Sequence, residues 1–155
     1  TELLGLRRTE IDGMYDGENR RCMPTAGCTL PAAQASTLCE VAALDEKDPA
    51  EPLSLYDEDY FAGHPAAALH RYGKGRAYYL ASRFDEAFYR AFYHDAAKEI
   101  GLSPAWPEAL PEGVLAVRRG SFVFVQNCTE QPVTVGNTVL ARYRTAVWKD
   151  MDRIF

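Results

Sequence analysis

The stretch His70–Ser82, HRYGKGRAYYLAS, decides how the middle of this 155-residue chain is interpreted. Gly73 and Gly75 flank a lysine, as in loops that bind phosphate. A P-loop requires G-x-x-x-x-G-K-[ST] followed by a helix whose N-terminal amides hold the phosphate, and a dinucleotide-binding loop requires a third glycine. Neither pattern is present. Because residues suited to strands lie on both sides, the sequence predicts a β-hairpin whose turn exposes Lys74 to solvent.

A helix is predicted directly after the hairpin. Residues 82–85, SRFD, have the form of a capping box at a helix start. Downstream, apolar residues recur every four positions and form one stripe along a helix: Phe84, Phe88, Phe92 and Ala96, with Tyr89, Tyr93 and Ala97 beside them and Ile100 at the end. Gly101 and Pro104 follow, and both are typical of a helix end. Aromatic residues at this spacing more often form core than a cofactor site, so we interpret the stripe as core.

The best domain boundary lies in residues 104–112, which contain three prolines. Before it, alternating residues such as Leu53–Tyr56 predict strands, while the apolar run Ser36–Leu44 fits either a short helix or a buried strand. After it, short runs rich in valine and phenylalanine predict only strands. We therefore predict an α/β domain over residues 1–103, a Pro-rich linker over 104–112, and a small all-β, sandwich-like domain over 113–155.

Composition and charge exclude several classes of protein. The net charge is −5 and basic residues are scattered, whereas sequence-independent nucleic-acid binding needs a basic stripe. No apolar run approaches the roughly 18 residues that span a bilayer. The four cysteines, Cys22, Cys28, Cys39 and Cys128, match no zinc or redox spacing, although a disulfide or shared metal at Cys22 and Cys28 stays open. We predict reduced thiols in a cytoplasmic protein without nucleic-acid or membrane partners.

Residue types that carry catalysis are present, but not in catalytic patterns. Carboxylates cluster at Glu10 and Asp12 and again in Asp57–Asp59, yet nothing around them predicts the raised pKa that the acid of a glycosidase requires. Cys28 and Cys39 do not lie in a nucleophile elbow, and the three histidines lack metal-ligand spacing. We therefore predict no catalytic, cofactor-binding or metal-ligating residue in this chain, and no cofactor.

Four segments together resemble the glycoside hydrolase family 42 β-galactosidases. Residues 4–12, LGLRRTEID, are similar to that family's L-G-x-x-x-x-E-x-D. Residues 56–63, YDEDYFAG, resemble its Y-x-x-D-F-Y-A-G with the two aromatics exchanged, and residues 70–81, HRYGKGRAYYLA, resemble N-R-Y-G-K-G-K-A-Y-Y-I-A. Leu110–Asn127 resembles the start of the family's small C-terminal β domain. The resemblance covers nearly the whole chain in the family's order.

What this resemblance implies is partly negative. Family members begin with a (β/α)8 barrel that carries both catalytic glutamates and cleaves terminal β-D-galactosides with retention, and no part of that barrel is in this sequence. Their middle domain, with an α/β fold similar to class I glutamine amidotransferases and flavodoxin, mediates homotrimer assembly and helps to wall the neighbour's active site. The zinc-binding cysteines of some members also lie in the barrel. The resemblance thus predicts the latter part of the trimerisation domain plus the C-terminal β domain, inactive alone.

Two other functions stay open at this point. The chain is alternatively a free-standing carbohydrate-binding or interaction module, in which Trp106, Trp148 and tyrosines stack on sugar rings. A third hypothesis is an amidotransferase-like enzyme with a cysteine nucleophile, which requires a thiol of lowered pKa.

Overall fold

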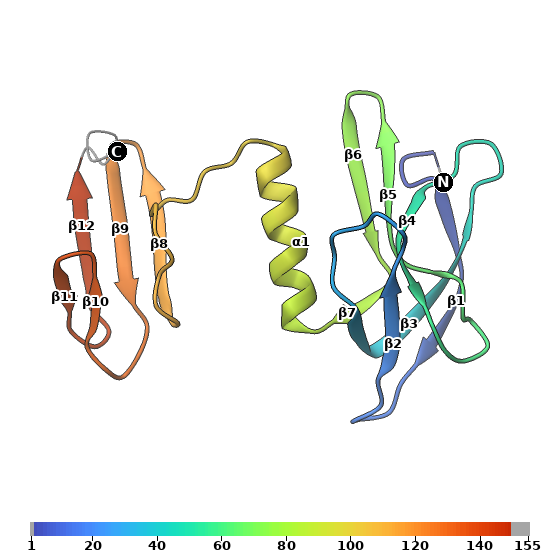
Figure 1. The fold of residues 1–155 in the computed structure, drawn as a ribbon, viewed down its shortest axis with the longest axis horizontal. Helices are drawn as coiled ribbons and strands as arrows, with labels where there is room; N and C mark the ends of the chain where they lie inside the picture. Colours follow the sequence, from blue (N-terminus) through green and yellow to red (C-terminus); the bar gives the residue numbers. More distant parts are fainter. Residues whose placement is uncertain (1, 150–155) are drawn as a thin grey trace. The chain divides into compact units, whose positions relative to one another are not determined.

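A computed structural model describes residues 2–149 (Figure 1). The chain divides into two compact units, Thr1–Ala96 and Ala97–Phe155; the predicted boundaries at residues 103 and 112 remain predictions. Within the described residues, no helix is both long enough and apolar enough to cross a bilayer.

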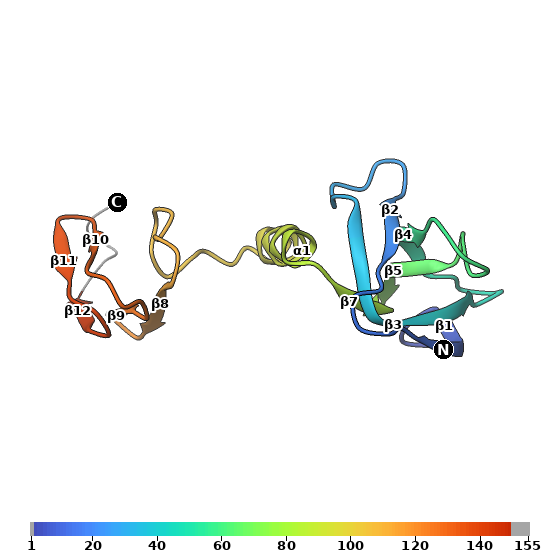
Figure 2. The same cartoon turned by 90° about the horizontal axis from the view of Figure 1, so that it is seen from below.

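The first unit is an antiparallel sheet that closes on itself. In chain order its elements are β1 (Leu6–Gly13), β2 (Arg20–Pro24), β3 (Ala33–Leu44), β4 (Glu51–Tyr56), β5 (Pro65–Tyr72), β6 (Gly75–Leu80), β7 (Ser82–Phe84) and most of α1 (Glu86–Glu99). The strand order is β1-β3-β2-β4-β5-β6, and β7 pairs with β3. Since only Ala81 separates β6 from β7, this continuous stretch returns the sheet to β3. Figure 2 shows β2, β4, β5, β7 and β3 around a common interior.

Ala81 joins the two ends of the sheet through its backbone. Its N–H donates to the Ala66 carbonyl, and its own carbonyl accepts the N–H of Glu40, both at 2.8 Å. The buried Tyr56 hydroxyl donates to the same Ala81 carbonyl at 3.0 Å. The junction therefore has its backbone groups paired, as a buried position requires.

The predicted α/β, flavodoxin-like fold is wrong. Every strand pairing in the described residues is antiparallel, and α1 is the one helix in that part of the chain. Parallel strands need crossovers of a dozen or more residues, usually helical. The connection from β5 to β6, in contrast, is Gly73 and Lys74 alone. The resemblance implied the fold of a whole family domain, whereas residues 1–103 themselves carry only one helical pattern.

The run Ser36–Leu44, which fitted helix or strand, belongs to β3. Its register places Ala33, Ala35, Cys39 and Val41 in the interior. This long strand contacts β2 and β7 with its first half and β1 with its second half. The core around it combines small residues with aromatic ones, namely Cys22, Leu30, Ala33, Ala35, Cys39, Val41, Tyr56, Phe61, Ala66, Ala67, Ala81, Phe84, Phe88 and Phe92.

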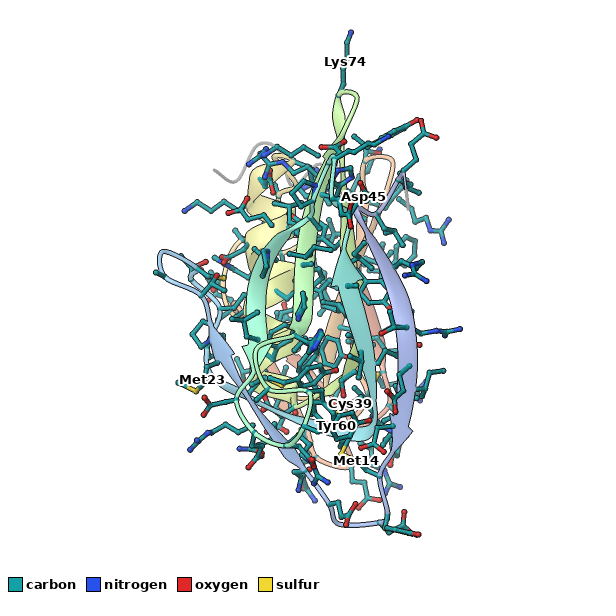
Figure 3. All side chains as sticks on the ribbon, turned by 90° about the vertical axis from the view of Figure 1, so that its right-hand side faces the viewer. Met14, Met23, Cys39, Asp45, Tyr60 and Lys74 are labelled. Atoms are coloured by element: carbon teal, nitrogen blue, oxygen red, sulfur yellow. The ribbon has the colours of Figure 1, made fainter. Side chains whose placement is uncertain are left out.

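The hairpin prediction for His70–Ser82 is confirmed. Tyr72 pairs with Gly75 across a two-residue turn. Gly73 has φ +58°, whereas Lys74 is not among the residues with positive φ, which is the pattern of a type II′ turn. Lys74 extends away from the molecule at the tip (Figure 3).

The predicted helix is present, but its start and its stripe differ from the prediction. Ser82 lies in β7 and its hydroxyl donates to the Leu38 carbonyl at 2.5 Å, while Asp85 caps the helix by accepting the Phe88 N–H at 3.0 Å. Phe88 and Phe92 are buried as predicted. Ile100 is exposed and lies beyond the helix, which ends at Glu99.

Gly101 ends the helix, as predicted. Its φ is +68° and its N–H donates to the Lys98 carbonyl, while the Leu102 N–H reaches the Ala97 carbonyl. These two bonds form a Schellman motif, which glycine favours because it has no Cβ.

Between residues 114 and 149, the regular elements of the second unit are all strands. They are β8 (Val114–Arg119), β9 (Phe122–Asn127), β10 (Val133–Val135), β11 (Thr138–Leu140) and β12 (Thr145–Lys149). β8, β9 and β12 form a three-stranded sheet with β9 in the centre, and β10 and β11 form a two-stranded ribbon. The core gathers Trp106, Val114, Val123, Val125, Val135 and Leu140.

Asn127 is the polar centre of this second core. Its side chain is fully buried. Its Nδ2 donates to the carbonyls of Gln131, Leu140 and Ala141 at 2.7, 3.2 and 3.1 Å. Its Oδ1 accepts the backbone N–H and the hydroxyl of Thr129, both at 2.8 Å. One amide thus ties the end of β9 to two loops, so a buried polar residue organises the unit.

Candidate functional site

The acidic tip Asp57–Asp59 is neutralised by a basic pair. Arg20 Nε lies 3.0 Å from Asp59 Oδ2, and Arg21 Nη2 lies 2.5 Å from Asp57 Oδ2. The backbone N–H of Arg21 donates to Glu58 Oε1 at 2.5 Å. These carboxylates therefore fasten the turn after β4 to β2.

Glu10 is held in a similar way. It lies on edge strand β1, and its Oε1 accepts the Tyr60 hydroxyl at 2.8 Å. This hydrogen bond to a carboxylate raises the pKa of Tyr60 to about 12.

Glu40 forms a partly buried cluster that sequence reasoning missed. Its Oε1 lies 2.9 Å from Arg8 Nη1, and its Oε2 accepts a hydrogen bond from the Tyr79 hydroxyl. Burial disfavours the carboxylate, but the Tyr79 hydroxyl and the Arg8 guanidinium outweigh that cost and lower the pKa of Glu40. Nothing in the sequence joins these three residues, because closure of the sheet brings β1, β3 and β6 together.

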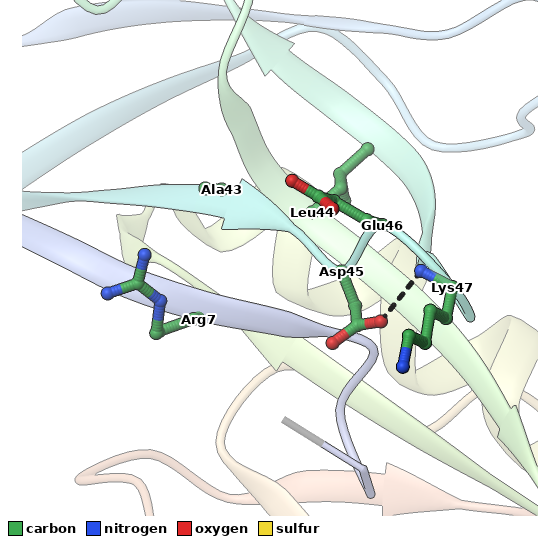
Figure 4. Close-up of a pocket in the computed structure, with 6 residues that line it drawn as sticks. All are labelled: Arg7, Ala43, Leu44, Asp45, Glu46 and Lys47. Carbon is green, nitrogen blue, oxygen red and sulfur yellow. Dashed lines mark hydrogen bonds between the residues drawn. The ribbon is translucent and has the colours of Figure 1, made fainter.

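An open pocket of about 420 Å³ lies where β1 and β3 meet. Figure 4 shows its lining: Arg7, Ala43, Leu44, Asp45, Glu46 and Lys47. Asp45 Oδ1 accepts the backbone N–H groups of Lys47 and Asp48 at 2.9 and 3.2 Å, which lowers the pKa of Asp45. Its carboxylate thus fixes the turn after β3.

The cysteines are free thiols, so the disulfide left open for Cys22 and Cys28 does not form. Cys22 and Cys39 are fully buried. Burial raises the pKa of Cys22 to about 12 and also raises the pKa of Cys39. Since the thiolate is the nucleophile, these two positions oppose the amidotransferase-like hypothesis.

The histidines lie apart and each has a local partner. His64 Nδ1 lies 3.1 Å from the Ala42 carbonyl, and the exposed His94 lies beside Asp95. Over residues 2–149 no three His, Cys, Asp or Glu side chains are grouped to hold a metal ion.

His70 is buried against the start of the chain. Its Nδ1 lies 2.9 Å from the Leu3 carbonyl, and its Nε2 lies 3.2 Å from Asp48 Oδ2 without hydrogen-bond geometry. The hydrogen bond to Leu3 raises the pKa of His70, burial opposes it, and Asp48 adds to the rise. Gly5, at φ +59°, packs so closely that an added Cβ would lie 2.4 Å from His70 Cδ2. His70 thus anchors the segment before β1.

The tryptophans belong to the second core and do not form a sugar platform. Trp106 is buried, and its ring meets the edge of the Trp148 ring at a centroid distance of 5.0 Å and an angle of 66°. Stacking on sugar, as the module hypothesis requires, needs an exposed ring face.

Comparison with known proteins gives a consistent answer. A family model described as the β-galactosidase trimerisation domain matches residues 1–103. The chain belongs to this family, within glycoside hydrolase family 42. The β-galactosidase BglY of Alicyclobacillus acidocaldarius is 42% identical over 137 residues, covering 84% of this chain and 20% of BglY. Pbg of Clostridium perfringens is 30% identical, covering 86% of this chain and 20% of Pbg.

Solved β-galactosidases share the fold. The enzyme from Rahnella sp. R3 superposes with a TM-score of 0.81 at 33% identity, covering 94% of this chain and 24% of that chain. The enzyme from Bacillus circulans sp. alkalophilus has a TM-score of 0.76 at 23% identity, covering 95% of this chain and 23% of that chain. The chain spans about a fifth of the length of the curated relatives it matches.

The segments that resembled the β-galactosidase family now have structural roles. Residues 4–12 form the His70-anchored segment and most of β1, and residues 56–63 form the turn held by Arg20 and Arg21. Residues 70–81 form the β5–β6 hairpin and the Ala81 junction. In this trimerisation domain the family's sequence signatures therefore mark turns and closures.

Proposed function

We propose that this chain is an assembly region of a longer β-galactosidase and performs no bond cleavage itself. The supporting observation is the match of residues 1–103 to the β-galactosidase trimerisation domain. In this proposal the longer protein is a homotrimer that hydrolyses terminal β-D-galactosides with retention, using two glutamates of a barrel outside these residues.

The chemistry of the described carboxyl groups supports a non-catalytic role. A retaining glycosidase needs two carboxyl groups about 5 to 5.5 Å apart across a cleft, one of them with a raised pKa. Burial raises the pKa of Glu40, but the Tyr79 hydroxyl and the Arg8 guanidinium outweigh it and lower that pKa, and the backbone N–H groups of Lys47 and Asp48 lower the pKa of Asp45. Asp57, Glu58 and Asp59 are engaged with Arg20 and Arg21.

The compartment belongs to the same proposal. Four free thiols, two of them fully buried, fit a reducing environment, and we propose the cytoplasm.

The proposal is tested by comparing two polypeptides. The 155-residue chain is expected to release no aryl galactoside product above background. The longer polypeptide is expected to turn the substrate over, to give the β-anomer first by NMR, and to have a trimeric mass by light scattering. Turnover by the 155-residue chain alone, or a monomeric active enzyme, would contradict the proposal.

A further inference from the structure

The outer face of the β8-β9-β12 sheet is apolar, and no other part of the second unit that the structure describes covers it. Strand alternation sends Val123 and Val125 into the core and turns Phe122 and Phe124 outward. Register places Val117 and Val147 on either side of Phe124. Leu115 is 60% exposed, Val117 51%, Val147 53% and Phe124 38%. Figure 1 shows the three strands side by side with β9 in the centre.

A soluble antiparallel sheet usually carries polar residues on its solvent face. The nine outward positions of this sheet are Leu115, Val117, Arg119, Phe122, Phe124, Gln126, Thr145, Val147 and Lys149. Five are large and apolar, and they form one contiguous strip. Contiguous exposed apolar strips with a polar rim mark interaction surfaces.

The rim of the strip has a definite charge. Arg119 and Lys149 flank Phe122 at one end, with Lys149 Nζ 5.9 Å from the Phe122 ring centre. No outward position carries a carboxylate. Across residues 113–149 there are five basic residues and a single acidic one, Glu130. The complementary surface is therefore apolar in the middle and acidic at the end that meets Arg119 and Lys149.

The size of the strip indicates a tethered partner. A separate protein partner needs about 800 Å² per side, which a strip of five apolar side chains on three short strands does not offer. A partner in the same polypeptide needs less, because tethering raises its effective concentration to about millimolar. The matching β-galactosidases are about five times longer than the region this chain covers.

We propose that this face docks against an apolar, acid-rimmed surface of the same β-galactosidase polypeptide outside these 155 residues. The inference rests on the proposed function, since it requires the longer protein. In that protein the remainder of the chain covers the outer face of the sheet, while the inner face packs on the core with the β10-β11 ribbon. Phe124 lies at the centre of the contact, and Arg119 and Lys149 fix the orientation of the docked surfaces.

Thiol labelling tests this docking. V147C places a thiol on the strip, and V139C places a matched thiol on ribbon strand β11, where Val139 is 68% exposed. Both are made in the 155-residue chain and in the longer β-galactosidase. Iodoacetamide labelling is followed by peptide-resolved mass spectrometry, with V117C as a second strip position in case V147C disturbs folding, which tryptophan fluorescence reports.

We expect similar rates for V147C and V139C in the 155-residue chain, and labelling of V147C at least about tenfold slower than V139C in the longer protein. In the longer protein, the double variant Arg119→Glu, Lys149→Glu should restore fast labelling of V147C.

Equal labelling rates for V147C and V139C in the longer protein would overturn the docking. Protection of V147C that charge reversal does not change would overturn the acidic rim. Protection in the 155-residue chain that disappears on dilution would assign the face to a second copy, and concentration-independent protection would assign it to this chain itself; either would overturn the proposal. Galactosidase activity and mass are measured separately, so failure of the proposed function is distinguishable from failure of the docking.

Discussion

The two units bury apolar residues in different ways. In the first unit the stretch through Ala81 returns the sheet to β3, and α1 adds Phe88 and Phe92, so aromatic side chains are enclosed. In the second unit a three-stranded sheet covers its core on one side and leaves Phe124 and its neighbours outward. Closure of the sheet, more than composition, decides whether an apolar strand face is hidden.

Charge follows the same division. Residues 1–96 carry sixteen acidic and ten basic residues, whereas residues 97–155 carry six acidic and seven basic. The enclosed unit is thus acidic, whereas the charges of the one-sided unit nearly balance. Both tryptophans lie in the second unit and eight of the nine tyrosines in the first, so each unit has its own spectroscopic signal.

The enclosed core is tested most severely by Phe88→Ala. Phe88 is fully buried and stacks on Phe84 at 4.1 Å, so truncation should lower the free energy of unfolding by about 3 to 5 kcal/mol. Urea denaturation followed by tyrosine near-UV circular dichroism measures this. Tyr93→Ala, which removes an exposed aromatic from the same helix, is the control. Equal midpoints for the two variants would mean that the interior is not packed as described.

The polar centre of the second unit is tested by Asn127→Ala. The variant removes the side-chain partner of the buried Leu140 carbonyl and of the partly buried Thr129 N–H, which should cost about 3 kcal/mol. Tryptophan fluorescence during urea denaturation reports the loss. Gln126→Ala, at the exposed neighbouring position, should change stability by less than about 0.5 kcal/mol. A similar small effect of both changes would show that Asn127 is dispensable.

The His70 anchor gives the first unit a pH dependence. Because the pKa of His70 is raised in the folded chain, its contribution to stability is complete below the unfolded value near 6.5 and is lost as pH rises through the folded pKa. Asp48→Asn should therefore lower the melting temperature more at about pH 6 than at about pH 8.5. Tyrosine circular dichroism at both pH values measures the difference. If the loss of melting temperature caused by Asp48→Asn were constant or grew with pH, His70 would not be the source of this pH dependence.

The smallest effect is expected on the solvent face of α1. Arg90 Nη2 lies 2.5 Å from Glu86 Oε1 one turn earlier, and both side chains are about four-fifths exposed. A double-mutant cycle of Arg90→Ala and Glu86→Ala should give a coupling of about 0.3 to 0.5 kcal/mol. A coupling above about 1 kcal/mol would indicate that this face is covered.

Local chemistry made part of the structure predictable. The roles of Gly73 and Gly101 follow from turn and cap preferences that act over a few residues, and the strands after residue 113 follow from short runs rich in valine and phenylalanine. Closure through Ala81 was not predictable, because it depends on pairing between β3 and β7, more than 40 residues apart. The Glu40 cluster was missed for the same reason. The α/β prediction failed because the resemblance implied the fold of a whole family domain, whereas residues 1–103 carry one helical pattern.

β3 also has a consequence for how the protein is made. The first half of β3 cannot complete its strand pairing until Ser82–Phe84 has been synthesised, because Ser36 pairs with Arg83, which lies 47 positions later. While the ribosome synthesises the intervening residues, the strand has one unpaired edge that favours association between nascent chains. Polypeptides that stop before Phe84 should therefore be substrates for chaperones or aggregate, and those that extend past it should not.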